Sequence, residues 1–232
     1  MAREMLLEFA RNGGRILRGT VRHIREIVEG GIGAFARPID GELCKPPAAI
    51  VVCAGIGARF IGGIEDTTVF PVRNEVVKLR APWITMGKAA YDQNLDISVF
   101  VVPLGDGDVV IGGHATINDW YPKPRPITVK HLLEKAATLC PELLTPPGDE
   151  RVPDIQSLVV WEGCDIFGNR RDGPRLDVEW HSAPDFKRKI PVVMNYGYGK
   201  AELRAFKGIA DAAIRLVDAA LAQQMEQIET TS

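Results

Sequence analysis

Residues 48–53 form an uninterrupted apolar run, AAIVVC, that few kinds of local structure can accommodate. The run is rich in β-branched side chains, and Gly55 and Gly57 follow it closely. This combination is typical of a buried strand that leads into a tight turn, most often a strand of a parallel sheet. We therefore predict a parallel strand over residues 48–53, which gives this part of the chain α/β character.

The middle of the chain has the pattern of an antiparallel sheet instead. Residues 69–79 alternate loosely between apolar and polar side chains, and residues 98–102 are rich in strand-forming types. Asp106 and Gly107 are a strong hairpin signal between residues 98–102 and the next apolar run. The expected fold class is therefore α+β with an α/β corner, in which helices flank a mixed or antiparallel sheet.

Helical spacing of the apolar residues indicates three helices. The first is short, covers residues 6–10 and ends at the glycines that follow, after which we expect an extended strand from residue 15. The second covers residues 128–140 and is ended by Pro141. The third is long and amphipathic and runs from Leu203 to Met225.

The composition excludes several kinds of partner. The net charge of −2 includes no long run of either sign, so neither a nucleic acid nor a membrane surface is an expected partner. No signal peptide is recognised, which favours an intracellular location, and the C-terminal Thr-Thr-Ser is not a peroxisomal signal. The compartment itself stays unknown. The four cysteines lack disulfide-framework and zinc-ligand spacing, so no metal site is predicted.

Five blocks of the sequence are together similar to those of one enzyme family. They are residues 50–59, 70–77, 111–122, 173–176 and 195–199. In this order and spacing the chain resembles the FAD-dependent D-amino-acid oxidase and D-aspartate oxidase family, in its fungal-like form and over the C-terminal two thirds of the family's length. The resemblance implies an oxidoreductase that oxidises D-amino acids with O₂, with FAD and a small amino-acid-like substrate as ligands.

The resemblance also implies two lobes and an incomplete cofactor fold. Residues 1–66 and 190–232 match a remnant of the FAD-binding lobe, and residues 67–189 match the substrate-binding lobe. Such folds bind the cofactor diphosphate with Gly-x-Gly-x-x-Gly after their first strand. Here Gly55-Ile56-Gly57 lacks the third glycine, so the N-terminal dinucleotide-binding motif is absent. We expect a truncated or partial member of the family, whose binding of FAD without a further chain is in question.

Several positions match cofactor contacts of the family. In relatives, glycines at the start of the C-terminal helix let its backbone approach the flavin closely. Lys200 and Glu202 stand at such glycine positions here, and we expect the side chain and charge of Glu202 to crowd a flavin. Lys200 also counts as a substituted substrate position. The full set of expected cofactor contacts is Ala54, Gly55, Arg73, Gly199, Lys200, Ala201, Glu202 and Leu203.

The positions that hold the substrate carboxylate in the family are substituted. Relatives use a bidentate arginine together with tyrosine hydroxyls. Phe167 stands at the position of the arginine, and Phe100 and Ala115 stand at the positions of two tyrosines. Arg170 or Arg171 stays open as a replacement clamp.

Two functions from different classes stay open. The first is an FAD-dependent oxidase-family enzyme of D-amino acid metabolism with an altered pocket, weakly active or inactive as an isolated chain, with unknown catalytic residues. The second is a non-catalytic, degenerate paralogue that acts as a binding or interaction module, in other words a pseudoenzyme. The substitutions cluster at pocket positions while the scaffold blocks persist, which favours weak or absent oxidase activity. The resemblance to dimeric relatives leaves a homodimer open, and the sequence does not decide the oligomeric state.

Overall fold

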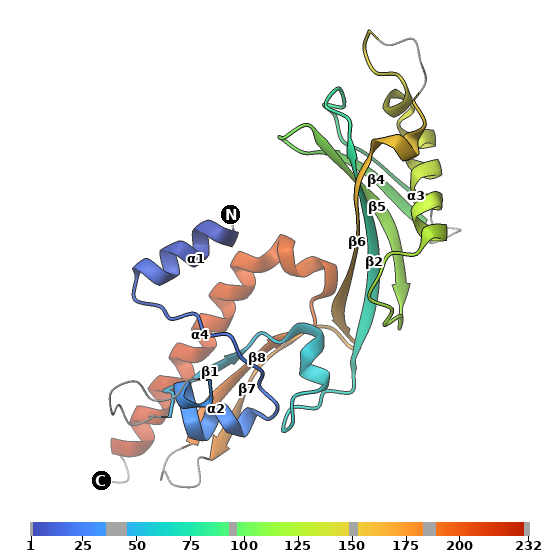
Figure 1. Ribbon diagram of the computed structural model, residues 1–232. Coiled ribbons are helices and arrows are strands. Elements are labelled where there is room, and N and C mark those ends of the chain that lie inside the picture. The colour runs from blue at the N-terminus through green and yellow to red at the C-terminus, as the bar shows by residue number, and fades with distance from the viewer. Residues whose placement is uncertain (1, 36–45, 93–96, 149–152, 183–188, 230–232) are drawn as a thin grey trace. The chain divides into compact units, whose positions relative to one another are not determined.

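The protein is described by a computed structural model that covers residues 2–35, 46–92, 97–148, 153–182 and 189–229 (Figure 1). It divides into two compact units, each with a sheet of its own. The first unit comprises Met1–Val69 and Arg170–Ser232, and the second comprises Phe70–Asn169.

A three-stranded sheet forms the centre of the first unit. Helix α4 contacts β8 and β7, while alternate residues of β8 pack with helix α2 in an apolar core (Figure 1). Strand β1 runs parallel to β8, which confirms the predicted parallel strand, and β7 runs antiparallel to β8. The sheet order is β1 (Ile50–Val52), β8 (Lys189–Tyr196), β7 (Arg175–Ser182), and the two helices are α2 (Ile24–Gly30) and α4 (Glu202–Glu229).

The N-terminal part of this unit differs from the sequence prediction. Helix α1 (Ala2–Arg11) forms as expected, but the strand expected from residue 15 is wrong, because residues 15–22 have no regular secondary structure. A strand needs a neighbour that satisfies its backbone N–H and C=O groups, and the described sheet offers this stretch none. Ile16 and Leu17 are accordingly exposed.

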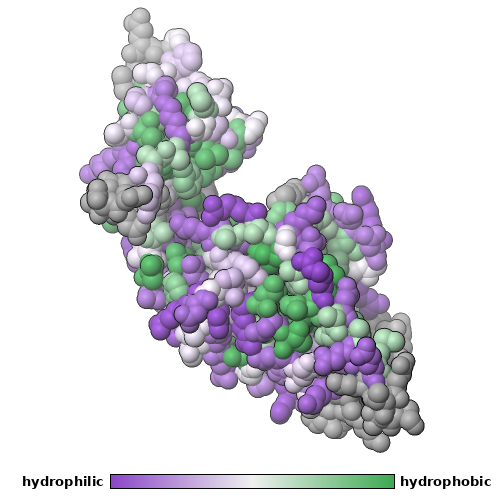
Figure 2. Space-filling model, turned by 180° about the vertical axis from the view of Figure 1, so that it is seen from behind, coloured by the Kyte–Doolittle hydropathy of each residue, from purple (hydrophilic) through white to green (hydrophobic). Residues whose placement is uncertain are grey.

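Large apolar side chains are exposed in both units. Figure 2 shows them interspersed with hydrophilic ones on the face seen from behind. In the first unit Val51 of β1 is 43% exposed, so the predicted strand is less buried than its sequence suggests. The exposed apolar residues of α1 are Met5, Leu6, Leu7 and Phe9.

The second unit is a five-stranded sheet with helix α3 packed on one face. Its core lies between α3 and the inward-facing residues of the strands, among them Val77, Val101 and Ile111. The predicted strands over residues 69–79 and 98–102, the hairpin and the helix are confirmed. The sheet order is β3 (Lys88–Asp92), β4 (Ile97–Pro103), β5 (Asp108–Ile117), β2 (Val69–Arg80), β6 (Val159–Arg170), and the helix is α3 (Pro126–Leu139).

Short 3₁₀ helices complete both units. They are η1 (Gly31–Ala34), η2 (Gly55–Arg59), η3 (Pro141–Leu144), η4 (Ile155–Leu158) and η5 (Gly199–Ala201). The boundaries of the two units lie at residues 69/70 and 169/170, whereas the sequence placed them at 66/67 and 189/190. The main difference is β7, which pairs with β8 over its whole length and therefore lies in the first unit. The assignment of one lobe to FAD and the other to substrate stays a prediction.

The sheet face of the second unit that points away from α3, called the open face below, is shaped by a β-bulge. The register between β2 and β5 shifts between Glu75 and Val76, and Gly113 is the extra residue. On this face the ring of Phe100 lies over Gly112. A Cβ atom added at Gly112 would come within 2.7 Å of that ring and within 2.9 Å of Val76. Glycine thus leaves the space that the ring of Phe100 occupies.

We expect Gly112→Ala to lower the free energy of unfolding by about 1–3 kcal/mol, because the added methyl group overpacks this site. Gly105→Ala is the matched control, since a Cβ atom there meets no heavy atom within 4 Å. Urea unfolding followed by tryptophan fluorescence measures both. Equal stability of the two variants would show that the ring of Phe100 does not lie against β5.

Candidate functional site

In the first unit, the carboxyl ends of two parallel strands meet the start of a long helix. Strand β1 ends at Val52 beside Met194 of β8, and the chain continues into Cys53, Ala54 and Gly55. Ligands of α/β folds bind where parallel strands end, and the N-terminus of a helix attracts negative charge. Helix α4, with 28 residues, begins directly after the turn that follows β8.

The turns at these strand ends need glycine. Gly55 has φ +52° and Gly199 has φ +55°, in the left-handed region where other residues are strained. Gly199 is buried and begins η5, the short turn that leads into α4. Both positions were predicted cofactor contacts, and the structure places them at the two strand ends.

Polar atoms gather in the same place. The side-chain amide of Asn195 donates to the Sγ atom of Cys53 over 3.5 Å. The Oδ1 atom of Asn195 and the hydroxyl oxygen of Tyr198 are buried and have no hydrogen-bond partner among the described residues. Burial raises the pKa of Tyr198, and the nearby Cys53 and Glu202 raise it further. Buried polar groups without partners are costly, so these two atoms are suited to a ligand.

The start of α4 is open to solvent. Lys200, Ala201, Glu202 and Leu203 are all exposed, with Leu203 73% exposed. The carboxylate of Glu202 raises the pKa of Cys53, after burial as the main cause, so its negative charge reaches the strand ends. The first unit thus brings seven of the eight predicted cofactor positions to one region, where their contact with a cofactor stays a prediction.

The eighth position, Arg73, lies in the second unit and is fully buried. Its guanidinium group donates to the carbonyl oxygens of Tyr121 and Lys123 and pairs with the carboxylate of Glu75. The other oxygen of Glu75 accepts from the backbone N–H of Arg125 over 2.8 Å, at the start of α3. Arg73 therefore anchors the segment before α3 to the sheet.

The open face of the second unit carries three of the four predicted substrate positions. Phe100 pairs with Gly112, and Ala115 pairs with Asn74 beyond the bulge, so the side chains of Phe100, Asn74 and Ala115 point to the open face. The Oδ1 atom of Asn74 is buried and has no hydrogen-bond partner among the described residues. Asn74 was not among the site residues predicted from the sequence.

Phe167 of β6 points to the open face as well. The Sγ atom of Cys164 lies 3.7 Å from the carbonyl oxygen of Tyr121, on the side that Arg73 occupies. Because side chains alternate along a strand, Asp165 and Phe167 point to the opposite side, which is the open face. Phe100, Ala115 and Phe167 therefore share one face, and Lys200 belongs to the other unit.

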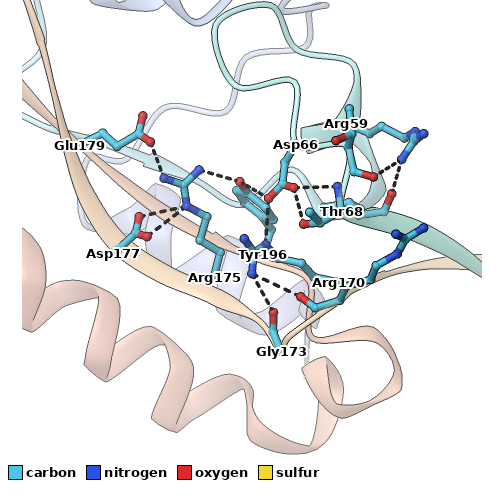
Figure 3. Close-up of polar contacts among 12 residues, drawn as sticks. Arg59, Asp66, Thr68, Arg170, Gly173, Arg175, Asp177, Glu179 and Tyr196 are labelled. Atoms are coloured by element: carbon cyan, nitrogen blue, oxygen red, sulfur yellow. Dashed lines mark hydrogen bonds and ion pairs between the residues drawn. The ribbon is translucent and has the colours of Figure 1, made fainter.

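Arg170, the residue left open as an alternative carboxylate clamp, uses its guanidinium group for hydrogen bonds within the first unit. Its Nε atom donates to Asp66 over 2.9 Å, and its Nη1 atom donates to the carbonyl oxygen of Gly173 over 3.3 Å (Figure 3). Tyr196 donates its hydroxyl to the same carboxylate and accepts from Arg175 (Figure 3). Arg171, the other alternative, is exposed.

The pKa of Asp66 follows from these contacts. Partial burial alone would raise it, but hydrogen bonds from Thr68, Arg170 and Tyr196 outweigh burial and lower the pKa of Asp66 from 3.8 to about 2. Asp66 is therefore ionised at neutral pH and ties the loop before β2 to the end of β6 and to β8 (Figure 3).

The described residues contain neither a metal-binding cluster nor a membrane-spanning helix. Within them, no three His, Cys, Asp or Glu side chains come together in a way that would hold a metal ion. The described helices also include none that is long and apolar enough to cross a membrane.

Comparison with known proteins gives one consistent family. Residues 1–216 match the family described as FAD dependent oxidoreductase. The D-aspartate oxidase of Cryptococcus neoformans var. grubii is 31% identical over 198 residues, which cover 74% of this chain and 49% of that protein. The D-amino-acid oxidase of Schizosaccharomyces pombe is 28% identical over 172 residues, which cover 74% of this chain and 47% of that protein. The chain thus spans about half the length of these relatives.

Solved structures support the fold. Glycine oxidase from Geobacillus kaustophilus is similar with a TM-score of 0.54 and 22% identity, over 74% of this chain and 41% of that one. Glycine oxidase from Bacillus cereus gives a TM-score of 0.56 and 14% identity, over 77% of this chain and 45% of that one. The predicted α+β architecture of this fold is confirmed.

Proposed function

Because this chain belongs to the FAD-dependent oxidoreductase family, we propose that its first unit contributes to an FAD site and its second unit presents a substrate-binding face. The proposal covers the part of the fold that this chain supplies. The contacts proposed for this unit are those at the ends of β1 and β8 and at the start of α4.

The observation that supports FAD most directly is the pair of unpartnered atoms at the strand ends. The Oδ1 atom of Asn195 accepts hydrogen bonds, and the hydroxyl of Tyr198 both donates and accepts. FAD carries hydroxyl and ring N–H groups that match them. Ala54 and the two glycines leave the backbone open to close approach. These residues therefore fit part of the cofactor, while the negative charge of Glu202 disfavours its diphosphate.

When bound, FAD would accept two electrons from the substrate, as its chemistry in oxidases requires. The chain's own contribution is to place the substrate on the open face. Phe167 and Phe100 offer no charge or hydroxyl to a carboxylate, and Arg170 is already paired. A charged hydrogen bond contributes about 1.5–3 kcal/mol, so losing a bidentate pair lowers affinity for a D-amino acid by about a hundredfold or more. We therefore propose weak or no activity on ordinary D-amino acids.

A second candidate is a non-catalytic paralogue. The specific observation in its favour is Glu202, whose charge reaches the site where FAD would be held. In that reading the two units persist as a folded scaffold that binds another ligand or protein. A homodimer, left open by the resemblance, belongs to the same set of proposals.

The visible spectrum of the purified chain, with and without added FAD, tests the cofactor proposal. We expect weak FAD binding that becomes up to about fivefold tighter in Glu202→Gln, because a charge at a helix start contributes about 0.3–1 kcal/mol. Asp211→Asn, which removes another exposed acid from α4, is the control and should change nothing.

The outcomes separate the two candidates. Flavin absorbance that responds to Glu202→Gln supports the FAD site, and anaerobic addition of D-alanine should then bleach it slowly or not at all. A protein that stays colourless with excess FAD in every variant would overturn the cofactor proposal for this chain and favour the non-catalytic reading.

A further inference from the structure

We propose that the open face of the second unit, around Asn74, binds a small organic ammonium ion with an apolar substituent, and not a carboxylate. This names a substrate class and rests on the proposed use of the open face for substrate. The inference comes from three features of the second unit: an unpartnered acceptor, a free carboxylate and two aromatic side chains.

The acceptor is the carboxamide oxygen of Asn74. It is buried, faces the open side of β2 and finds no donor among the described residues. A buried acceptor gains most from a ligand N–H group, and a charged donor makes the stronger bond. A carboxylate brings only acceptors at neutral pH, so it would meet this oxygen without a hydrogen bond.

The free carboxylate is Asp165 of β6. The N–H of Arg171 donates to the carbonyl oxygen of Thr68, so β6 ends where β2 begins and the neighbouring strands run antiparallel. Counting six residues along each strand from that bond, we infer that Asp165 lies opposite Asn74. Residues opposite each other in an antiparallel pair share a face. Asp165 is exposed and has no ion pair with any described residue.

The charge on this face is therefore negative near Asn74. The nearest cation along β2 on the same face, Lys78, is paired with Asp108, which Arg80 also contacts. The guanidinium of Arg73 lies on the opposite face, paired with Glu75. An ammonium group beside Asn74 and Asp165 meets an oxygen acceptor and an opposite charge, whereas a carboxylate meets like charge.

The aromatic side chains supply the apolar part of the site. Phe100 lies over Gly112, and Phe167 lies two residues beyond Asp165 on the same face. Both rings are partly exposed, so they can cover an apolar substituent. The faces of aromatic rings also attract cations. An amine with an aryl or alkyl group matches this combination.

A pair of probes with the same ring and opposite charge tests the proposal. We expect benzylammonium to bind the full-length chain at pH 7 and benzoate to bind at least tenfold more weakly, as measured by NMR titration without added FAD. Resonances of β2 and β6 should shift. Because no cofactor is present, failure of the FAD proposal leaves this result unaffected.

Three variants locate the site. Asp165→Asn should weaken the binding of benzylammonium about threefold to fivefold, as for the loss of an exposed ion pair. Asp172→Asn removes an exposed acid outside this face and should not change the affinity. Phe167→Arg should reverse the preference and raise the affinity for benzoate about tenfold or more. Equal or tighter binding of benzoate by the unmodified chain would overturn the proposal, and so would equal effects of the two Asp variants.

Discussion

Replacing Glu75 with alanine should lower the free energy of unfolding of the second unit by about 3–5 kcal/mol. The carboxylate of Glu75 is fully buried, pairs with Arg73 and accepts the N–H of Arg125 at the start of α3. Its removal leaves a buried guanidinium without its counter-charge, and breaking one side of a buried pair costs far more than the pair contributes.

Denaturant unfolding and hydrogen exchange check this expectation. Exchange should rise in β2 and α3, while β8 in the first unit stays protected. Glu142→Ala is the matched control, because its ion pair with Lys88 is at the surface, and it should change stability much less. If the two variants were equally stable, the Arg73–Glu75 contact would not hold the segment before α3 in place.

The second large effect is expected at Asp66 in the first unit. Asp66→Ala removes the acceptor of Arg170, Tyr196 and Thr68, and leaving such partly buried donors unsatisfied should cost about 2 kcal/mol or more. Hydrogen exchange should then rise in the first unit around β8 and the loop before β2, with α3 unchanged.

The pH dependence gives an independent reading of the same carboxylate. The pKa of Asp66 is about 2 in the folded protein, against 3.8 ordinarily. The ionised carboxylate therefore makes its full contribution to the free energy of unfolding above pH 4, and this contribution is lost as pH falls from about 4 to about 2. Between about pH 4 and about pH 2, the free energy of unfolding of Asp66→Asn should therefore fall less than that of the unmodified protein. Identical acid unfolding curves would contradict the assigned hydrogen bonds.

Sequence patterns predicted the helices and strands in which apolar and polar residues repeat at a regular spacing. The strand over β2, the hairpin between β4 and β5, and helices α3 and α4 follow from periodicity and turn residues. The parallel strand β1 followed from its apolar run, although Val51 is more exposed than that run suggests. The prediction of a strand from residue 15 was wrong because strand formation depends on a neighbouring strand that the local sequence does not specify.

The candidate site was predictable only in part. The positions of Phe100, Ala115 and Phe167 came from the resemblance. Ala115 shares the face of the other two because of a bulge at Gly113, which no sequence pattern predicted. Arg73, a predicted cofactor contact, lies in a buried network with Glu75, and its contact with a cofactor stays a prediction. The spacing of Arg73 and Glu75, two apart on one strand, was the signal that could have suggested this pair.

The sequence by itself determined the family and the main elements, because these depend on residue types and on spacing along the chain. The loss of the carboxylate-binding residues stays a prediction. Only the tertiary structure decided which polar groups keep partners. Asn74, Asn195 and Tyr198 each have a buried polar side-chain atom that finds no hydrogen-bond partner among the described residues. That balance of burial and hydrogen bonding arises between segments, and it decides which faces of the two units are suited to a ligand.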